Sequence, residues 1–219
     1  MFESDRPEVP EDSRLRLAAA TRQVISELAS SSAIDPDSAF AKARDLVEQA
    51  VAILAASDHP RTHHGGEASL AAHQQSKSFL ASSPFIGLLN PLSPPISMEM
   101  SETMAIGTVR YGAAYEGPPG CVHGGFIAAG FDEVLGFAQA LSGRPGMTGR
   151  LDISYRSPTP LLHEVRYEGW IDRVDGRKIF ASATLRHGDT VCAEATGLFI
   201  SMRPEVYERF MRLRAGADG

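Results

Sequence analysis

A Gly-Gly pair at the start of an apolar stretch, and two adjacent acids within that stretch, are the residues whose types and spacing could do chemistry. Gly124 and Gly125 open a run that we expect to form a helix, and the first backbone N–H groups of a helix have no partner within it. Such groups bind an anion or polarise a carbonyl oxygen. Asp132 and Glu133 follow in the same run, where burial disfavours their charged forms. The stretch therefore predicts an active site with an electrophilic end and a candidate base.

The Gly-Gly start of this helix and Asp132 are too far apart to act on the same reacting carbonyl. Eight residues separate Gly124 from Asp132, which is about 12 Å of helix rise, whereas catalytic groups act within hydrogen-bond reach. Two copies packed antiparallel about a twofold axis would place the N-terminus of one helix beside the middle of the other. We therefore expect an obligate dimer with two composite sites. For either acid, the alternative is a solvent-facing position or a structural ion pair.

Two further helices are expected before residue 57. Apolar residues recur at helical spacing over residues 11–30 and, more strongly, over residues 40–54. The Asp-Pro-Asp-Ser sequence at 35–38 is typical of a turn followed by an N-cap. Residues 57–75 are polar and rich in histidine, and residues 84–95 are dense in proline. This part of the chain therefore predicts a helical extension with connecting segments.

After residue 96 the pattern changes to β-strands. The Asp-Gly pair at 175–176 and the His-Gly-Asp sequence at 187–189 are hairpin signals, so neighbouring strands are expected to pair antiparallel. The expected strands cover residues 96–100, 105–111, 150–155, 163–174, 178–186 and 191–202. With the helix over residues 124–141, this pattern predicts an α+β domain, an antiparallel sheet wrapped around one long apolar helix and preceded by the helical extension.

The composition is that of an ordinary globular protein, with 219 residues, 43% of them hydrophobic, and a formal net charge of −6. The acidic balance argues against nucleic-acid or anionic-membrane partners, because their binding surfaces are basic. Cys121 and Cys192 lack zinc-like spacing and are too few for a secreted disulfide framework. The N-terminus lacks the apolar segment of a signal peptide, and no apolar run is long enough to span a bilayer. We expect a cytoplasmic protein with small-molecule or protein partners.

An ordered set of motifs between residues 84 and 202 makes the chain recognisable. The set consists of EGPPG at 116–120, HGG at 123–125, an acid at 132, the strand 148–155 leading into Arg-Ser-Pro at 156–158, and AEATGLF at 193–199. With this set the chain resembles the hotdog-fold acyl-coenzyme A thioesterases of the phenylacetate-pathway (PaaI-like) type. We accordingly expect a hotdog domain over residues 81–203, after a helical extension and linker over 1–80 and before a C-terminal tail over 204–219.

The resemblance implies a reaction, the hydrolysis of an acyl-CoA thioester to the free acid and CoA. A backbone N–H of Gly124 or Gly125 would polarise the thioester oxygen, as an oxyanion hole does, and Asp132 of the other subunit would activate water. A carboxylate in an apolar helix is a stronger base than one in water. Related enzymes place a Ser or Thr at the start of the strand after the helix to orient the water, and Thr148 occupies that position. His123 is expected to fix the turn as a structural residue.

Basic residues near these motifs are candidates for binding the phosphates of CoA. The first choice is Arg156, with the adjacent Ser157, because the resemblance places nucleotide contacts near that strand end. Arg177 and Lys178 follow at a hairpin, and for each of these cations a solvated surface charge is the alternative. The resemblance implies no cofactor besides the CoA thioester substrate. It also implies a homodimer or a dimer of dimers.

Other features of the sequence admit rival interpretations. A second HGG at 64–66 has His73 where the acid would stand, so we expect a loop there. The four histidines within residues 59–73 lack Cys, Asp or Glu partners at recognised spacing, and we expect no metal site. Cys121 is expected to be a packing residue rather than a nucleophile.

Two rival functions remain open. A hotdog hydratase or dehydratase acting on acyl thioesters would use a His and an acid, a pair that His123 and Asp132 could mimic, although their spacing favours a thioesterase. A non-catalytic acyl-CoA binding or regulatory module would share the fold without the chemistry. One departure from the family pattern bears on this choice. Many relatives carry Asn or Gln six residues before the HGG histidine, where this chain has Gly117, so a polar contact to the substrate carbonyl is expected to be missing.

Overall fold

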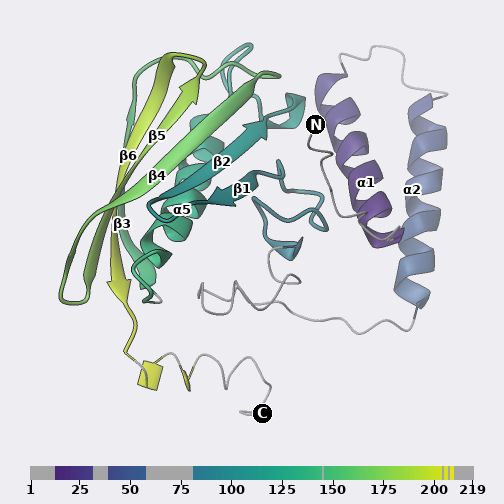
Figure 1. Cartoon of the computed structure of the whole chain (residues 1–219). Helices are drawn as coiled ribbons and strands as arrows, with labels where there is room; N and C mark the ends of the chain where they lie inside the picture. The colour runs from purple at the N-terminus through teal and green to yellow at the C-terminus, as the bar shows by residue number, and fades with distance from the viewer. Residues whose placement is uncertain are drawn as a thin grey trace, which may run out of the picture.

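In the computed structural model, a six-stranded antiparallel sheet wraps around one long helix, and two further helices stand beside it (Figure 1). The structure describes residues 13–31, 39–57, 81–144, 146–203, 205–206 and 208–209. The helices are α1 (Ser13–Ser30), α2 (Ala39–Ala56) and α5 (Gly124–Ala140), with a short 3-10 turn, η1 (Ala113–Tyr115). The strands are β1 (Ser97–Met100), β2 (Met104–Arg110), β3 (Gly146–Tyr155), β4 (Glu164–Asp175), β5 (Lys178–His187) and β6 (Thr190–Ser201). The expected α+β class is confirmed, and each expected helix and strand lies within a few residues of its predicted place.

The last three strands follow one another across the sheet because their turns are tight. Asp175 pairs with Lys178, and His187 pairs with Thr190, so each turn contains two residues. The first residue of each turn is a glycine with φ of 55°, a conformation that glycine adopts without strain. Both predicted hairpins are therefore confirmed.

β3 takes a place that the sequence pattern does not indicate. The strand order is β1-β2-β4-β5-β6-β3, so β3 follows α5 in the chain but pairs with β6 at the far edge of the sheet. The opposite edge of β3 has no partner strand within the described part of the chain, and most of its residues are exposed. An open edge of this kind is a template for pairing with another chain.

The core lies between α5 and the face of the sheet that curves around it. Every second residue of β5 is buried from position 179 to 185, as the two-residue period of a strand requires. Buried positions on α5 recur at steps of three and four, which marks the helix face turned toward the sheet. The largest fully buried side chains are Tyr111, Tyr167, Phe131, Phe199 and Leu135. Two of these five are tyrosines, whose hydroxyls need partners when buried.

The two buried tyrosines join the sheet to the first turns of α5. The hydroxyls of Tyr111 and Tyr167 lie 2.9 Å apart, and each is also within hydrogen-bond distance of a helix carbonyl, Phe126 at 3.5 Å and Ile127 at 3.4 Å. Burial raises the pKa of both phenols, so both stay neutral and able to donate. A Cβ at Gly130 would lie 2.5 Å from the Tyr167 hydroxyl. The helix can therefore lie this close to the sheet only with glycine at position 130.

A half-buried acid, Glu133, fastens the segment before β1 to α5. The Ser83 hydroxyl donates to Oε1 of Glu133 at 3.1 Å and accepts from the N–H groups of Phe85 and Ile86 at 3.3 Å each. Burial raises the pKa of Glu133 above its ordinary value of 4.5, the Ser83 hydrogen bond opposes this rise, and the charge of Asp132 adds to it. Glu133, rather than Asp132, is thus the acid that the chain itself partly buries.

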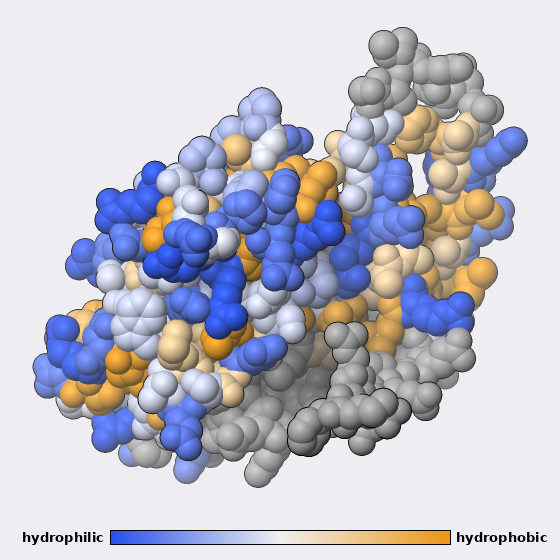
Figure 2. Space-filling view, turned by 45° about the horizontal axis from the view of Figure 1, so that its top comes forward, coloured by the Kyte–Doolittle hydropathy of each residue, from blue (hydrophilic) through white to orange (hydrophobic). Residues whose placement is uncertain are grey.

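The helix α1 is attached to the domain by one of its arginines. Nε of Arg22 donates to the carbonyl of Ser93 at 3.1 Å, and Nη2 donates to those of Leu88 and Asn90 at 2.9 and 3.3 Å. Helix α2 stands outside α1 and has no buried residue. Figure 2 shows apolar side chains gathered over these two helices, at the right of the view. The two helices confirm the helical part of the expected extension.

Some expectations fall outside the described residues. These are the turn at 35–38, the second HGG and its neighbouring histidines, and almost all of the expected C-terminal tail. None of the helices in the described ranges is long and apolar enough to cross a bilayer.

Replacing Gly130 with alanine is expected to lower the free energy of unfolding by about 1–3 kcal/mol, the usual cost of overpacking. The new methyl group would meet the Tyr167 hydroxyl inside the core. Urea unfolding followed by circular dichroism measures the change. Gly112→Ala is the control, because its Cβ would meet only Ser26 Oγ, at 3.7 Å. Equal stabilities of Gly130→Ala and wild type would contradict this packing.

Replacing Glu133 with glutamine is expected to change how stability depends on pH. A carboxyl whose folded-state pKa is raised stabilises the fold below its unfolded-state pKa, and this stabilisation is lost as the pH rises through the folded-state pKa. Each unit of elevation corresponds to about 1.4 kcal/mol. The stability of Glu133→Gln relative to wild type should therefore increase from pH 4.5 to 8 in urea titrations. The exposed Glu99→Gln is the charge-matched control; an equal increase in that variant would refute the assignment.

Candidate active site

The EGPPG sequence forms a closed turn that leads into α5. Oε1 of Glu116 accepts the N–H of Gly120 at 2.7 Å, and the N–H of Gly117 donates to the carbonyl of Cys121 at 2.9 Å. A further N–H, from Val122, donates to the carbonyl of Thr159 at 2.9 Å. The turn is thus braced from inside by a glutamate and from outside by the loop after β3. The bracing role of Glu116 was not anticipated from its place in the motif.

Gly117 is required by the backbone that passes over it. A Cβ at this position would lie 2.7 Å from Cα of His123, closer than side chains are tolerated against backbone. The Asn or Gln expected from related sequences would therefore displace His123 and the helix start that follows it. The glycine at 117 belongs to the geometry of this turn.

The N-terminus of α5 leaves one candidate donor. His123 is the N-cap: its Nδ1 accepts the N–H of Gly125 at 3.0 Å, and its carbonyl accepts those of Phe126 and Ile127 at 3.0 and 3.3 Å. With Nδ1 accepting, a neutral ring carries its proton on Nε2. No acceptor for the Gly124 N–H is found among the described residues. Of the two glycines predicted as oxyanion donors, Gly124 therefore has its amide available and Gly125 does not.

The side chain of Tyr155 lies against the backbone carbonyl of Gly124. Its hydroxyl donates to the carbonyl of Gly124 at 2.8 Å, although its side chain remains largely exposed. A Cβ at Gly124 would lie 3.2 Å from this hydroxyl. Sequence reasoning missed Tyr155, because the contact joins the end of β3 to the start of α5 across 31 positions. The adjacent Arg-Ser-Pro motif was the nearest signal.

Asp132 lies on the opposite face of α5 from the sheet core. Within the single chain its side chain is exposed, and Oδ1 accepts a hydrogen bond from Oγ1 of Thr148 at 2.8 Å. The structure thus joins two of the predicted site residues. The expectation that the apolar helix buries Asp132 is not met within one chain, because the apolar neighbours lie on the other face. Around Asp132 that face carries mostly small residues, at positions 125, 128, 129 and 136.

The predicted CoA-binding residues fall into two groups. The N–H groups of Arg156 and Ser157 donate to the carbonyl of Cys192, beside the Gly124 end of α5, and Arg156 pairs with Glu194 at 2.7 Å. At the other end of β6, Nε of Arg177 donates to the Ser201 carbonyl at 2.9 Å, and Lys178 follows. Nine residues of strand separate Cys192 from Ser201, about 30 Å. One chain therefore does not gather these cations into one cluster.

The rival sites find no support in the described ranges. No group of three or more potential metal-ligating side chains is found there, and the histidines at 59–73 lie outside them. Cys121 is half-buried, with its backbone bridged to Pro160. Since Nδ1 of His123 accepts from Gly125, it is not available to activate this thiol. The packing role of Cys121 stays a prediction.

Comparisons with known proteins agree with this architecture. The family model described as Thioesterase superfamily matches residues 119–194. The acyl-coenzyme A thioesterase THEM4 of Mus musculus is 39% identical over 106 residues, which cover 48% of this chain and 46% of that protein. The acyl-coenzyme A thioesterase THEM5 of Homo sapiens is 32% identical over 96 residues, covering 43% of this chain and 39% of that protein. The matches therefore span less than half of the length of these curated relatives.

A crystal structure of a thioesterase superfamily protein matches more of the chain. It is 30% identical, superposes with a TM-score of 0.71, and the match covers 87% of this chain and 96% of that one. Its coverage extends beyond the sheet and α5, whereas the family model is confined to residues 119–194. On this identity and coverage, the chain belongs to the thioesterase superfamily, whose members have the hotdog fold seen here.

Proposed function

We propose that this protein hydrolyses an acyl-CoA thioester to the free acid and CoA. The observation that carries the proposal is the unpartnered Gly124 N–H at the start of α5, an amide in the position of an oxyanion donor. The curated relatives named acyl-coenzyme A thioesterases, 32–39% identical over the matched region, support the same class of reaction. No cofactor takes part in the proposed chemistry.

In the proposed mechanism, Asp132 acts as the base toward water. Its carboxylate takes a proton as the water oxygen bonds to the thioester carbon, and the carbonyl oxygen becomes an oxyanion that accepts from the Gly124 N–H. The carbon–sulfur bond then breaks, and the CoA thiolate leaves with the proton held by Asp132. Thr148 fixes the orientation of the carboxylate through its 2.8 Å hydrogen bond. His123 holds the helix start in place as the N-cap.

The two catalytic groups come from different protomers in this proposal. Within one chain, Gly124 and Asp132 are separated by eight helical residues, about 12 Å, and Asp132 lies on an uncovered face with small neighbours. The open edge of β3, which carries Thr148, borders this face. An antiparallel partner helix would bring its own Asp132 toward Gly124 and would cover both features. We therefore propose a homodimer or a dimer of dimers.

The dimer would also bring together the two groups of predicted CoA-binding residues. Arg156 and Ser157 lie at the N-terminal end of α5, and Arg177 and Lys178 lie toward its C-terminal end. Antiparallel packing brings the second group of one protomer toward the first group of the other. Together they would bind the CoA phosphates. We also propose a cytoplasmic location, for which the free thiols of Cys121 and Cys192 are the support.

Gly124→Pro is expected to remove the oxyanion donor without disturbing the helix. Proline lacks the N–H, fits the first position of a helix, and follows the extended backbone of His123 without a clash. The value of kcat for acyl-CoA hydrolysis, followed as thiol release, should fall about 10²–10³-fold. Gly124→Ala is the matched control, since it keeps the N–H and brings a Cβ only against the exposed tip of Tyr155.

Unchanged kcat in Gly124→Pro, with the fold intact by circular dichroism, would rule out this amide as the donor. A change in enoyl absorbance without thiol release would instead indicate the hydratase alternative. Binding of CoA thioesters with no turnover, unaffected by Asp132→Asn, would indicate the non-catalytic module.

Mixing Asp132→Asn with Gly124→Pro protein is expected to restore activity that neither has alone. Each hybrid dimer contains one site built from an intact Gly124 and an intact Asp132. Random reassociation makes half of the dimers hybrid, so about a quarter of wild-type kcat per protomer should return. Dimer exchange followed by the thiol-release assay measures this, with each variant mixed with itself as control. No recovery, once exchange is verified by mass spectrometry, would contradict the cross-subunit site.

A further inference from the structure

Strand β3 is hydrogen-bonded to α5 at both of the residues that the proposed mechanism uses. Oγ1 of Thr148 donates to Oδ1 of Asp132 at 2.8 Å, and the Tyr155 hydroxyl donates to the carbonyl of Gly124 at 2.8 Å. The bond from Thr148 orients the base. The bond from Tyr155 reaches the residue that carries the oxyanion donor, so it bears on the electrophilic half of the site.

A β-bulge in β3 places both of these side chains on the face toward α5. Thr148 and Tyr155 are seven positions apart, so in a regular strand they would point to opposite faces of the sheet. The register with β6 shifts at Gly149, which leaves one extra residue in β3. Thr148 is therefore opposite Phe199 and Tyr155 is opposite Ala193, two buried residues that lie on one face of β6. Bulges beside active sites commonly redirect a side chain in this way.

The sheet fixes the place from which the Tyr155 side chain reaches the helix. Its backbone pairs with Ala193 of β6, and the N–H groups of the next two residues donate to the carbonyl of Cys192 at 2.8 and 3.0 Å. Tyr155 is 54% exposed, so water is available as another partner for its hydroxyl. Burial therefore does not require the bond to Gly124, as it requires the bonds of the two core tyrosines.

The first turn of α5 needs an external hold because it begins with two glycines, the residue type with the greatest backbone freedom. Among the described residues the Gly124 N–H has no acceptor, so no bond at the amide itself sets its direction. The peptide group between Gly124 and Gly125 is held at both ends instead. Tyr155 donates to its oxygen at 2.8 Å, and its N–H donates to Nδ1 of His123 at 3.0 Å.

We propose that Tyr155 is a positioning residue that fixes the direction of the Gly124 N–H through its bond to the Gly124 carbonyl. The inference rests on the proposed function, which makes this amide the oxyanion donor. Tyr155 acts through the backbone and touches none of the reacting atoms in this role. A donor that is fixed in advance stabilises the transition state more than the substrate, so the hydroxyl of Tyr155 should affect kcat rather than KM.

Replacing Tyr155 with phenylalanine removes the hydroxyl and keeps the ring. The value of kcat in the thiol-release assay should fall about fivefold, which corresponds to one neutral hydrogen bond, and KM should stay unchanged. Unfolding in urea should also stay unchanged, because the side chain is largely exposed. A rise in KM with kcat unchanged would make Tyr155 a contact of the substrate and would overturn the positioning role.

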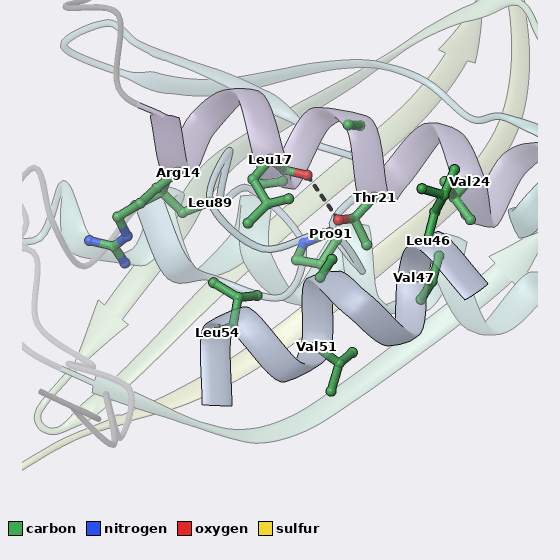
Figure 3. Close-up of a pocket in the computed structure, with 13 residues that line it drawn as sticks. Arg14, Leu17, Thr21, Val24, Leu46, Val47, Val51, Leu54, Leu89 and Pro91 are labelled. Atoms are coloured by element: carbon green, nitrogen blue, oxygen red, sulfur yellow. Dashed lines mark hydrogen bonds between the residues drawn. The ribbon is translucent and has the colours of Figure 1, made fainter. Parts of the chain in front are cut away.

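Thr21→Val is the matched control. The Thr21 hydroxyl also donates to a helix carbonyl at 2.8 Å, that of Leu17, but on α1, where Thr21 lines an apolar groove between α1 and α2 (Figure 3). Valine has nearly the shape of threonine and removes this bond. Both kcat and KM of Thr21→Val should equal those of wild type. An equal fall in kcat in the two variants would show that the effect does not depend on the place of Tyr155.

Mixed dimers test which half of the site Tyr155 supports. Tyr155 holds Gly124 of its own chain, so a partner with an intact Gly124 should compensate for its loss. After random reassociation, Tyr155→Phe mixed with Asp132→Asn should show about 0.3 of wild-type kcat per protomer, and Tyr155→Phe mixed with Gly124→Pro only about 0.1. Equal activities of the two mixtures would contradict the assignment to the Gly124 half.

Hydrogen exchange at the Gly125 amide tests the same inference without any substrate. This N–H belongs to the peptide group that Tyr155 holds, so Tyr155→Phe should speed its exchange about fivefold in NMR of glycine-labelled protein, and Thr21→Val should not. Unchanged exchange in Tyr155→Phe, or wild-type kcat in Tyr155→Phe when Gly124→Pro is inactive, would refute this inference alone. No thiol release from wild type would refute the proposed function, and the exchange rates would still decide whether Tyr155 fixes the turn.

Discussion

The hydrogen bonds at the N-terminus of α5 are the constraint on which the site depends. A helix begins with amides that lack partners within it, and here His123 takes up those of Gly125 and of the two residues that follow. His123 is itself held, because its N–H donates to the carbonyl of Tyr115 at 2.9 Å and Gly117 lies directly against its Cα. The Gly124 amide is therefore fixed before any ligand arrives. Preorganised stabilisation of an oxyanion requires such a donor, since none of the binding energy is then used to orient it.

The two faces of α5 have opposite surroundings, and this difference explains why the two adjacent acids differ. Glu133 points into the packed side and is bonded to Ser83, so burial raises its pKa. Asp132 points to the side that the chain leaves open, where Thr148 holds one of its oxygens. Small residues around Asp132 leave room for a neighbouring backbone.

The local sequence pattern was sufficient to predict most helices and strands. Contacts between segments far apart in the sequence could not be predicted from it. Apolar residues at alternating positions in β5 and at steps of three and four in α5 predict a strand and a helix, because each period follows from backbone geometry. The place of β3 beside β6 depends on contacts between distant segments, and no local period reports them. For the same reason the sequence did not reveal that Tyr155 bonds Gly124, or that Ser83 lies against Glu133.

The α1–α2 extension and the active-site turn share one loop. Arg22 of α1 donates to three carbonyls of residues 88–93, and the Tyr115 hydroxyl donates to the carbonyl of Leu92 in the same loop at 3.2 Å. The Tyr115 backbone carbonyl, in turn, holds the N–H of His123. These contacts connect the extension physically to the active-site turn. Energetic coupling between the two would require the loop to have two arrangements that differ both at Arg22 and at Tyr115.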